Sequence, residues 1–100
     1  MYYTEFKSWL DEQNVSTKIQ KDYISRLKTI QRDLSPYYDI LEEYRKNKCQ
    51  EILRFFDDKG FLFKVYCEET QLPIGKPYLS AYKLALKKYI MFLEIFLAEK

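Results

Sequence analysis

A chain of 100 residues is long enough for one hydrophobic core and too short for two. Hydrophobic residues make up 47% of it and charged residues 32%, a balance typical of a globular protein and not of a disordered one. The net charge is only +2, so bulk electrostatics does not by itself indicate a polyanionic partner. With two glycines and three prolines, the composition favours long helices over a turn-rich β fold.

The N-terminal residues lack the basic and apolar regions of a signal peptide, and the most apolar stretch, residues 89–98, is about half the length needed to span a bilayer. These features predict a soluble, cytoplasmic domain without a membrane partner. Cys49 and Cys67 are far apart in the sequence, and the chain has no histidine. We therefore expect two reduced thiols and no structural metal site.

The first predicted helix covers residues 3–13 and the second covers residues 17–34. Apolar residues at spacings of three and four mark the first helix: Tyr3, Phe6, Trp9 and Leu10. Asn14 is suited to end it, Ser16 is suited to cap the second helix, and Val15 just before that cap can form a hydrophobic staple. One predicted buried stripe runs along the second helix: Ile19, Tyr23, Leu27, Ile30 and Leu34.

Ser35-Pro36 is expected to end the second helix and to begin a third. Apolar spacing then predicts helices over residues 37–46 and 49–58, separated by the polar residues 45–48; one bent helix is the alternative. Gly60 is the expected stop. Residues 61–71 fit either a strand or a helix, and helix is preferred because a lone strand would have no partner.

Residues 72–77 are predicted to form a loop, and the last helix is predicted from residue 77 to the end. Its main apolar face comprises Leu79, Tyr82, Leu86, Tyr89, Ile90, Leu93 and Leu97. A second apolar stripe, roughly opposite, comprises Leu84, Met91 and Ile95. The predicted architecture is therefore one all-α domain over residues 1–100, a compact bundle of four to five helices.

The residues needed for common catalytic sites are missing. Without histidine the chain can form no Ser-His or Cys-His pair, and two glycines are too few for a phosphate-binding loop. Acidic residues occur as adjacent pairs, which point about 100° apart on a helix and so do not converge on one substrate. We expect no enzymatic activity, no cofactor and no small-molecule substrate.

The second helix carries the one patterned charge feature. Its basic residues Lys18, Lys21, Lys28 and Arg32 lie within about 80° of each other, opposite the predicted buried stripe. With Arg26, residues 17–32 contain five basic residues and one acidic residue, Asp22. Such a row, with hydroxyls such as Thr17 and Ser25 nearby, suits the DNA backbone, although a plain solvated face has the same composition. Lys76, Lys83 and Lys87 form a smaller basic strip.

Two stretches resemble a known family. Residues 15–27, VSTKIQKDYISRL, resemble the start of the N-terminal, SAM-like core-binding domain of the tyrosine recombinases (phage integrases), which typically has a Ser cap, a Tyr seven residues later and a Leu four further on. Ser16, Tyr23 and Leu27 fit this pattern. Residues 6–10, FKSWL, are similar to the family's first helix, and residues 79–93, LSAYKLALKKYIMFL, to its last. Ile19 and Gln20 depart from the pattern, in which a Thr and an apolar residue are usual.

The resemblance implies a non-catalytic domain that contacts duplex DNA through its second and last helices. By position it implicates Thr17, Lys18, Lys21, Lys28, Arg32, Lys83 and Lys87. The catalytic domain of a recombinase is not present in the 100 residues, so the resemblance implies either a fragment of a recombinase or a stand-alone relative that acts with a separate catalytic domain or another DNA-acting domain.

The alternative function is protein–protein interaction or dimerisation. It depends on apolar residues of the last helix outside its main face: Leu84, Met91, Phe92 and Ile95. Exposed together, they would form a patch able to recruit a second copy or a neighbouring domain.

Overall fold

The computed structural model describes residues 1–98, which fold into helices joined by loops, with no β-strand among them. In chain order the elements are α1 (Tyr3–Glu12), α2 (Thr17–Leu34), α3 (Ile40–Asn47), α4 (Gln50–Arg54), the 3-10 turn η1 (Asp58–Gly60), α5 (Leu62–Tyr66) and α6 (Leu79–Phe96). The radius of gyration is 13.3 Å, close to the value expected for a compact domain of this length. The predicted all-α class and compact bundle are confirmed, but residues 1–98 contain six α-helices where four to five were predicted.

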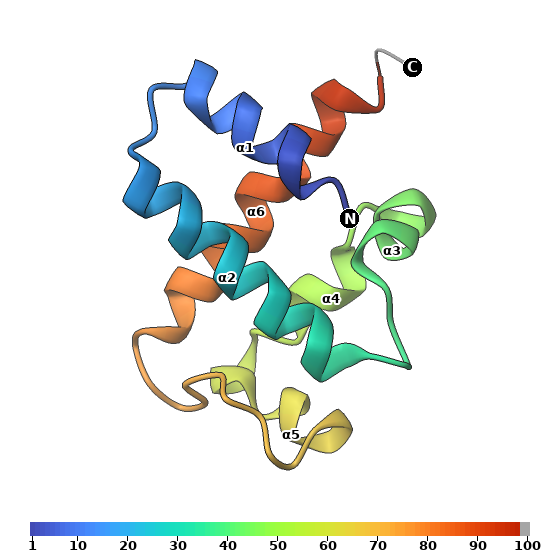
Figure 1. Ribbon diagram of the computed structural model, residues 1–100. Coiled ribbons are helices and arrows are strands. Elements are labelled where there is room, and N and C mark those ends of the chain that lie inside the picture. The colour runs from blue at the N-terminus through green and yellow to red at the C-terminus, as the bar shows by residue number, and fades with distance from the viewer. Residues whose placement is uncertain (99–100) are drawn as a thin grey trace.

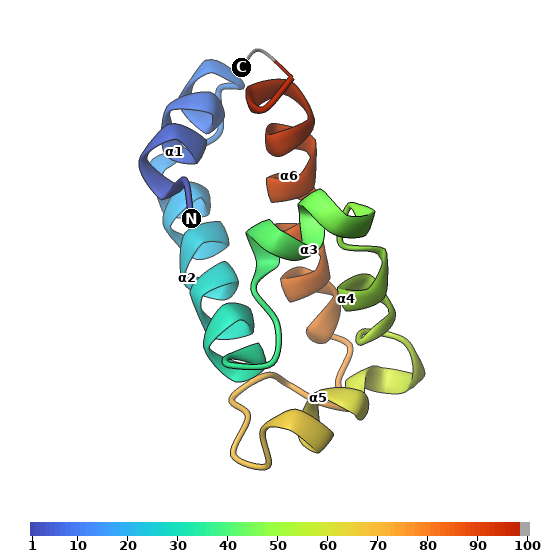
Figure 2. The ribbon, with the colours of Figure 1, turned by 90° about the vertical axis from the view of Figure 1, so that its right-hand side faces the viewer.

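The two longest helices, α2 and α6, pack against each other and form the centre of the fold (Figures 1 and 2). Helix α1 packs on both of them near the C-terminal end of α6. Helix α4 lies on the side of α6 away from α2, and α3 lies toward the viewer in front of α6 (Figure 2). One continuous hydrophobic core joins these layers and includes Phe6, Leu27 and Leu86, all fully buried. The outer side of α2 is left uncovered by this arrangement.

The buried stripe of α2 differs from the prediction at its first position. Tyr23, Leu27, Ile30 and Leu34 are buried as expected. Ile19, however, is 44% exposed, and Gln20 is fully buried in its place. Both positions lie within about 60° of the centre of the stripe, so helix periodicity cannot choose between them. The choice follows from the turn before α2, where the Gln20 amide donates to Asp11 Oδ1 (2.5 Å) and to the Val15 carbonyl (2.8 Å).

The start of α2 agrees with the sequence. Asn14 has a positive φ of 61° after α1, and the Ser16 side chain accepts a hydrogen bond from the Ile19 amide (3.4 Å). Val15 is partly buried against the core. The predicted cap and helix boundary are therefore confirmed.

The third helix begins later than predicted. Residues 35–39 form a connecting segment, and Ser35 and Pro36 do not begin a helix. Helix α3 starts at Ile40 because the Asp39 carboxylate accepts from the Glu42 amide (3.0 Å) and supplies the cap. The Gln31 side chain holds this segment by donating to the Tyr38 carbonyl (2.9 Å) and accepting from the Ile40 amide (2.7 Å).

Two separate helices follow, as expected. Lys48 and Cys49 both have positive φ values, 58° and 63°, which end α3 and redirect the chain into α4. Helix α4 ends at Arg54, four residues before the predicted end at residue 58, because the chain turns into η1. Residues 62–66 are helical, which confirms helix over strand, although the helix is shorter than residues 61–71.

The segment from residue 67 to 78 has no regular structure, and hydrogen bonds to Asp33 hold its first residues against the core. The buried Asp33 carboxylate accepts hydrogen bonds from the Thr70 hydroxyl and from Cys67 Sγ (3.7 Å). Gly60 has a φ of +82°, and a Cβ there would lie 2.6 Å from Leu79 Cδ2. The positive φ therefore favours glycine in this turn, and a larger residue would also have to displace the end of the Leu79 side chain.

Helix α6 begins at Leu79 and has one buried side. Leu79, Leu86, Tyr89 and Leu93 are buried, and Tyr82, Ile90 and Leu97 are partly buried. Leu84, Met91 and Ile95 are exposed, as the second stripe predicts. The prediction that Phe92 is exposed together with these residues is wrong. Phe92 is only 2% exposed because α1 covers it, and the centroids of the Phe92 and Phe6 rings lie 5.5 Å apart.

Candidate nucleic-acid interface

Four cations lie along the uncovered side of α2, and we call them the α2 basic row: Lys18, Lys21, Lys28 and Arg32. All four side chains are exposed, because the opposite side of the helix is packed against α6. From its first to its last member the row extends about 21 Å along the helix axis. The row is therefore neither buried nor divided between helices.

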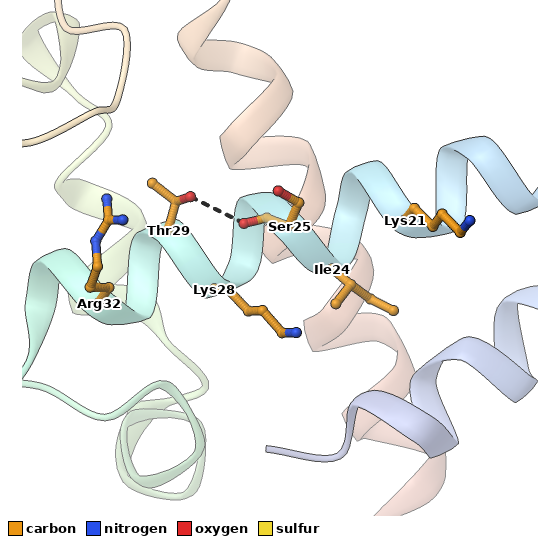
Figure 3. A pocket seen from close by; sticks show the side chains of 6 residues that line it. All are labelled: Lys21, Ile24, Ser25, Lys28, Thr29 and Arg32. Atoms are coloured by element: carbon orange, nitrogen blue, oxygen red, sulfur yellow. Dashed lines mark hydrogen bonds between the residues drawn. The ribbon is translucent and has the colours of Figure 1, made fainter.

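The surface between Lys21, Lys28 and Arg32 is a shallow depression of about 630 Å³ (Figure 3). Every side chain that lines it comes from α2, so it is an open strip along one helix and not an enclosed pocket. Thr29 Oγ1 donates to the Ser25 carbonyl (3.1 Å), so the hydroxyl hydrogen of Thr29 is not available to a ligand. The exposed Ser25 hydroxyl has no hydrogen-bond partner within residues 1–98 and can donate to a ligand oxygen. Thr17, at the first position of α2, is also exposed.

The four cations differ in how far neighbouring groups engage them. Arg32 lies 3.3 Å from the buried Asp33 carboxylate, which partly offsets its charge. Lys28 Nζ lies 5.3 Å from the centre of the Tyr3 ring, a cation–π distance that leaves the ammonium charge in place. Lys18 and Lys21 form no ion pair within the described part of the chain. The N-terminal half of the row therefore carries the most available charge.

Arg26 does not belong to this row, although it contributes to the charge of the segment. Its guanidinium donates to the Tyr78 hydroxyl (2.5 Å) and lies 5.4 and 5.9 Å from the centres of the Tyr78 and Tyr82 rings. Arg26 thus joins α2 to the start of α6. Of the five basic residues between 17 and 32, four face outward together.

Lys83 and Lys87 lie in a different place from the α2 basic row. They line a depression of about 240 Å³ beside α4, together with Arg54 and Asp57. Lys83 also lines a neighbouring depression of about 290 Å³. Figure 2 shows α2 on one side of α6 and α4 on the other. The structure therefore does not bring the predicted DNA contacts of the second and last helices into one surface.

A second group of cations surrounds Lys83, and we call it the α4–α6 basic cluster: Arg54, Lys59, Lys76, Lys83 and Lys87. The sequence indicated the last three members and missed Arg54 and Lys59. These two are distant from residues 76–87 in the chain, and no periodicity links them. Only the packing of α4 and η1 beside α6 brings them near.

The two thiols are free in the structure, and one of them is well protected. Cys49 is fully buried, and its Sγ donates to the Ile40 carbonyl at 3.4 Å. Burial, with a smaller contribution from Glu43 and Asp39, raises the pKa of the Cys49 thiol to about 12. A thiol with so high a pKa is a poor nucleophile at neutral pH. Among residues 1–98 no group of three or more side chains is placed to hold a metal ion.

The chain matches no protein-family model, no curated protein and no solved structure. Within residues 1–98, none of the helices combines the length and the apolar character that crossing a bilayer requires.

Proposed function

We propose that this chain is a non-catalytic domain that binds duplex DNA through the α2 basic row. The observation that carries the proposal is the exposure of Lys18, Lys21, Lys28 and Arg32 together on one rigid helix. Cations held in a row can displace the counterions condensed on a phosphate backbone, and this release drives binding that does not depend on base sequence. The similarity of residues 15–27 and 79–93 to the core-binding domain of phage integrases points to the same ligand.

The geometry of α2 suits contact with a duplex. The helix has 18 residues and so is about 27 Å long, and nothing in the described chain covers its outer side. The Ser25 hydroxyl lies between Lys21 and Lys28 and adds a neutral donor for phosphate oxygens (Figure 3). Because the α4–α6 basic cluster lies on another side of the molecule, it would contact a second segment of DNA or none.

A titration with duplex DNA over a series of salt concentrations tests the proposal. If all four cations contact phosphates, the slope of log K against log salt will be about −3.6. We expect the combined variant Lys21→Glu, Lys28→Glu and Arg32→Glu to lose measurable binding, because attraction becomes repulsion along most of the row. The corresponding glutamine variant, which places no carboxylate beside Asp33, will bind at least tenfold more weakly, with a slope about 2.7 closer to zero.

A control variant has the same change of charge on another side of the molecule, in the α4–α6 basic cluster. The variant Arg54→Glu, Lys83→Glu and Lys87→Glu reverses three members of the α4–α6 basic cluster, and we expect it to retain most of the wild-type affinity. Equal loss of binding in both triple variants would show that net charge, and not the α2 basic row, determines affinity. Unchanged binding by the α2 variants, with folding verified by circular dichroism, would refute the proposal.

A dimerisation module is the alternative function, favoured by the apolar side chains of α6 that remain at the surface. Leu84, Met91 and Ile95 are each about half exposed, at 46%, 51% and 49%. Light scattering on the same samples separates the two functions. Self-association that increases with concentration and is lost in Met91→Lys with Ile95→Lys would favour this alternative.

A further inference from the structure

A groove of about 370 Å³ lies between α1 and the C-terminal turns of α6. Its floor is apolar and mostly aromatic, formed by Trp9 of α1 with Phe92, Ile95 and Phe96 of α6. The rings of Trp9 and Phe92 lie 6.0 Å apart between centroids, and those of Phe92 and Phe96 stack at 5.0 Å. Figure 1 shows α1 passing beside this end of α6. Both walls are helices anchored in the core, so the groove is preformed.

The α1 side of the groove is acidic. Glu5 and Glu12 both line it and are exposed. They are seven residues apart, which places them on the same side of α1 with about 10.5 Å between their backbone positions. Neither forms an ion pair within residues 1–98, whereas Asp11, on another side of α1, pairs with Lys7 at 3.7 Å. Two carboxylates that have no ion-pair partner in the described part of the chain therefore border an aromatic floor.

The apolar surface continues beyond the groove along α6. Ile95 belongs both to the floor and to the exposed stripe that includes Met91 and Leu84. Ile95 and Met91 are about one turn apart and extend the apolar surface by about 6 Å, whereas Lys88 lies between Met91 and Leu84 on the same side of α6. An aromatic groove with this apolar extension and with acidic residues on its α1 side has the shape and charge to accept a helix with one apolar and one basic side.

We propose that the α1–α6 groove binds a basic amphipathic helix from a partner protein. Apolar side chains of that helix at spacings of three and four would lie on Trp9, Phe92 and Ile95. Two of its Lys or Arg residues, seven positions apart, would then match the spacing of Glu5 and Glu12, since both helices rise equally per residue. The proposal goes beyond DNA binding and is independent of it, because the groove shares no residue with the α2 basic row.

Trp9 is the only tryptophan of the chain, so its fluorescence reports directly on the groove. The probe is a tryptophan-free helical peptide of leucine and lysine, with leucines at helical spacing on one side and lysines seven residues apart along the edge of that side. We expect a saturable change in Trp9 emission on titration of the full chain. A peptide with glutamate in place of every lysine will cause no such change.

The variant Glu5→Lys with Glu12→Lys tests the acidic border, and we expect affinity for the lysine peptide to fall about tenfold or more. The glutamine variant at the same positions, which adds no positive charge, will show a smaller loss. The matched control Glu68→Lys with Glu69→Lys makes the same charge change at exposed positions outside the groove and will bind as the wild type does. Equal weakening in the control, or equal binding of both peptides, would overturn the proposal. A change in Trp9 emission with protein concentration alone would show that a second copy of the chain occupies the groove instead.

Discussion

Gln20 occupies a position on α2 where an apolar residue would ordinarily lie. Its side chain is fully buried, and the amide nitrogen satisfies the Val15 carbonyl and an oxygen of Asp11. The amide oxygen has no hydrogen-bond partner among residues 1–98. Gln20 therefore closes the turn between α1 and α2 at the cost of one unpaired acceptor, and this turn sets the angle at which α2 leaves α1.

Replacements of Gln20 should differ in how much stability they cost, because some of them bury a charge and others do not. Gln20→Leu keeps most of the volume and removes the unpaired oxygen, so we expect a loss of stability of only about 1 kcal/mol. Gln20→Glu replaces the donating amide with a carboxylate beside Asp11, and we expect a loss of about 3 kcal/mol or more at neutral pH. Urea denaturation of both variants measures the difference. A leucine variant less stable than the glutamate variant would contradict this account of the turn.

At the scale of the elements, the helix starts show how one capping side chain decides a boundary. Ser16 caps α2, as its sequence context predicts. Ser35 also has a favourable context, since Pro36 follows it, yet the cap of α3 is Asp39. Gln31 bonds to the backbone of Tyr38 and Ile40 and so keeps residues 35–39 out of a helix. A side chain from the preceding helix therefore decides where the next helix begins.

Alanine substitutions distinguish the true cap from the apparent one. We expect Asp39→Ala to reduce stability by about 1 kcal/mol, the usual cost of losing an N-cap hydrogen bond. Ser35→Ala will change stability little, because its hydroxyl caps no helix. Thermal or urea unfolding followed by circular dichroism provides the measurement. A larger loss for Ser35→Ala than for Asp39→Ala would place the start of α3 at Pro36.

At the scale of the whole molecule, two buried ionisable groups, the Tyr89 phenol and the Cys49 thiol, make the stability of the fold sensitive to alkaline pH. Tyr89 is fully buried at the centre of α6, and its hydroxyl accepts a hydrogen bond from the Tyr2 amide (3.0 Å). Burial raises the pKa of the Tyr89 phenol from 10.0 to about 12, although this hydrogen bond acts in the opposite direction. The pKa of Cys49 rises from 9.0 to about 12, also mainly through burial. Both groups therefore remain protonated in the fold at pH values where the unfolded chain ionises.

The contribution of these two groups to the free energy of unfolding will therefore have its full value below about pH 9. It will decrease as the pH rises to 12, because the unfolded state loses its protons first. The combined loss is on the order of several kcal/mol. Urea denaturation at pH 8, 9.5 and 11 measures this slope. The variant Tyr89→Phe with Cys49→Ala will be less stable at pH 8 but will lose less stability on going to pH 11. An unchanged slope would show that other groups govern the alkaline transition.

The sequence alone was sufficient for the features that depend on neighbours along the chain. Apolar spacing predicted the helical class, α1, α2 and α6 to within a few residues, the break between α3 and α4, and the outward side of the α2 basic row. These follow from a periodicity of 3.6 residues and from local caps, which need no knowledge of the rest of the molecule.

Tertiary packing decided the features that depend on which surfaces meet. It buried Gln20 in place of Ile19, covered Phe92 with α1, and placed Lys83 and Lys87 beside Arg54 and not beside α2. It also formed the α1–α6 groove from two segments about 80 residues apart in the chain. The periodicity of apolar residues identifies the buried side of a helix as a sector of about 100°. Which residues within this sector are covered is determined only by the neighbouring helices.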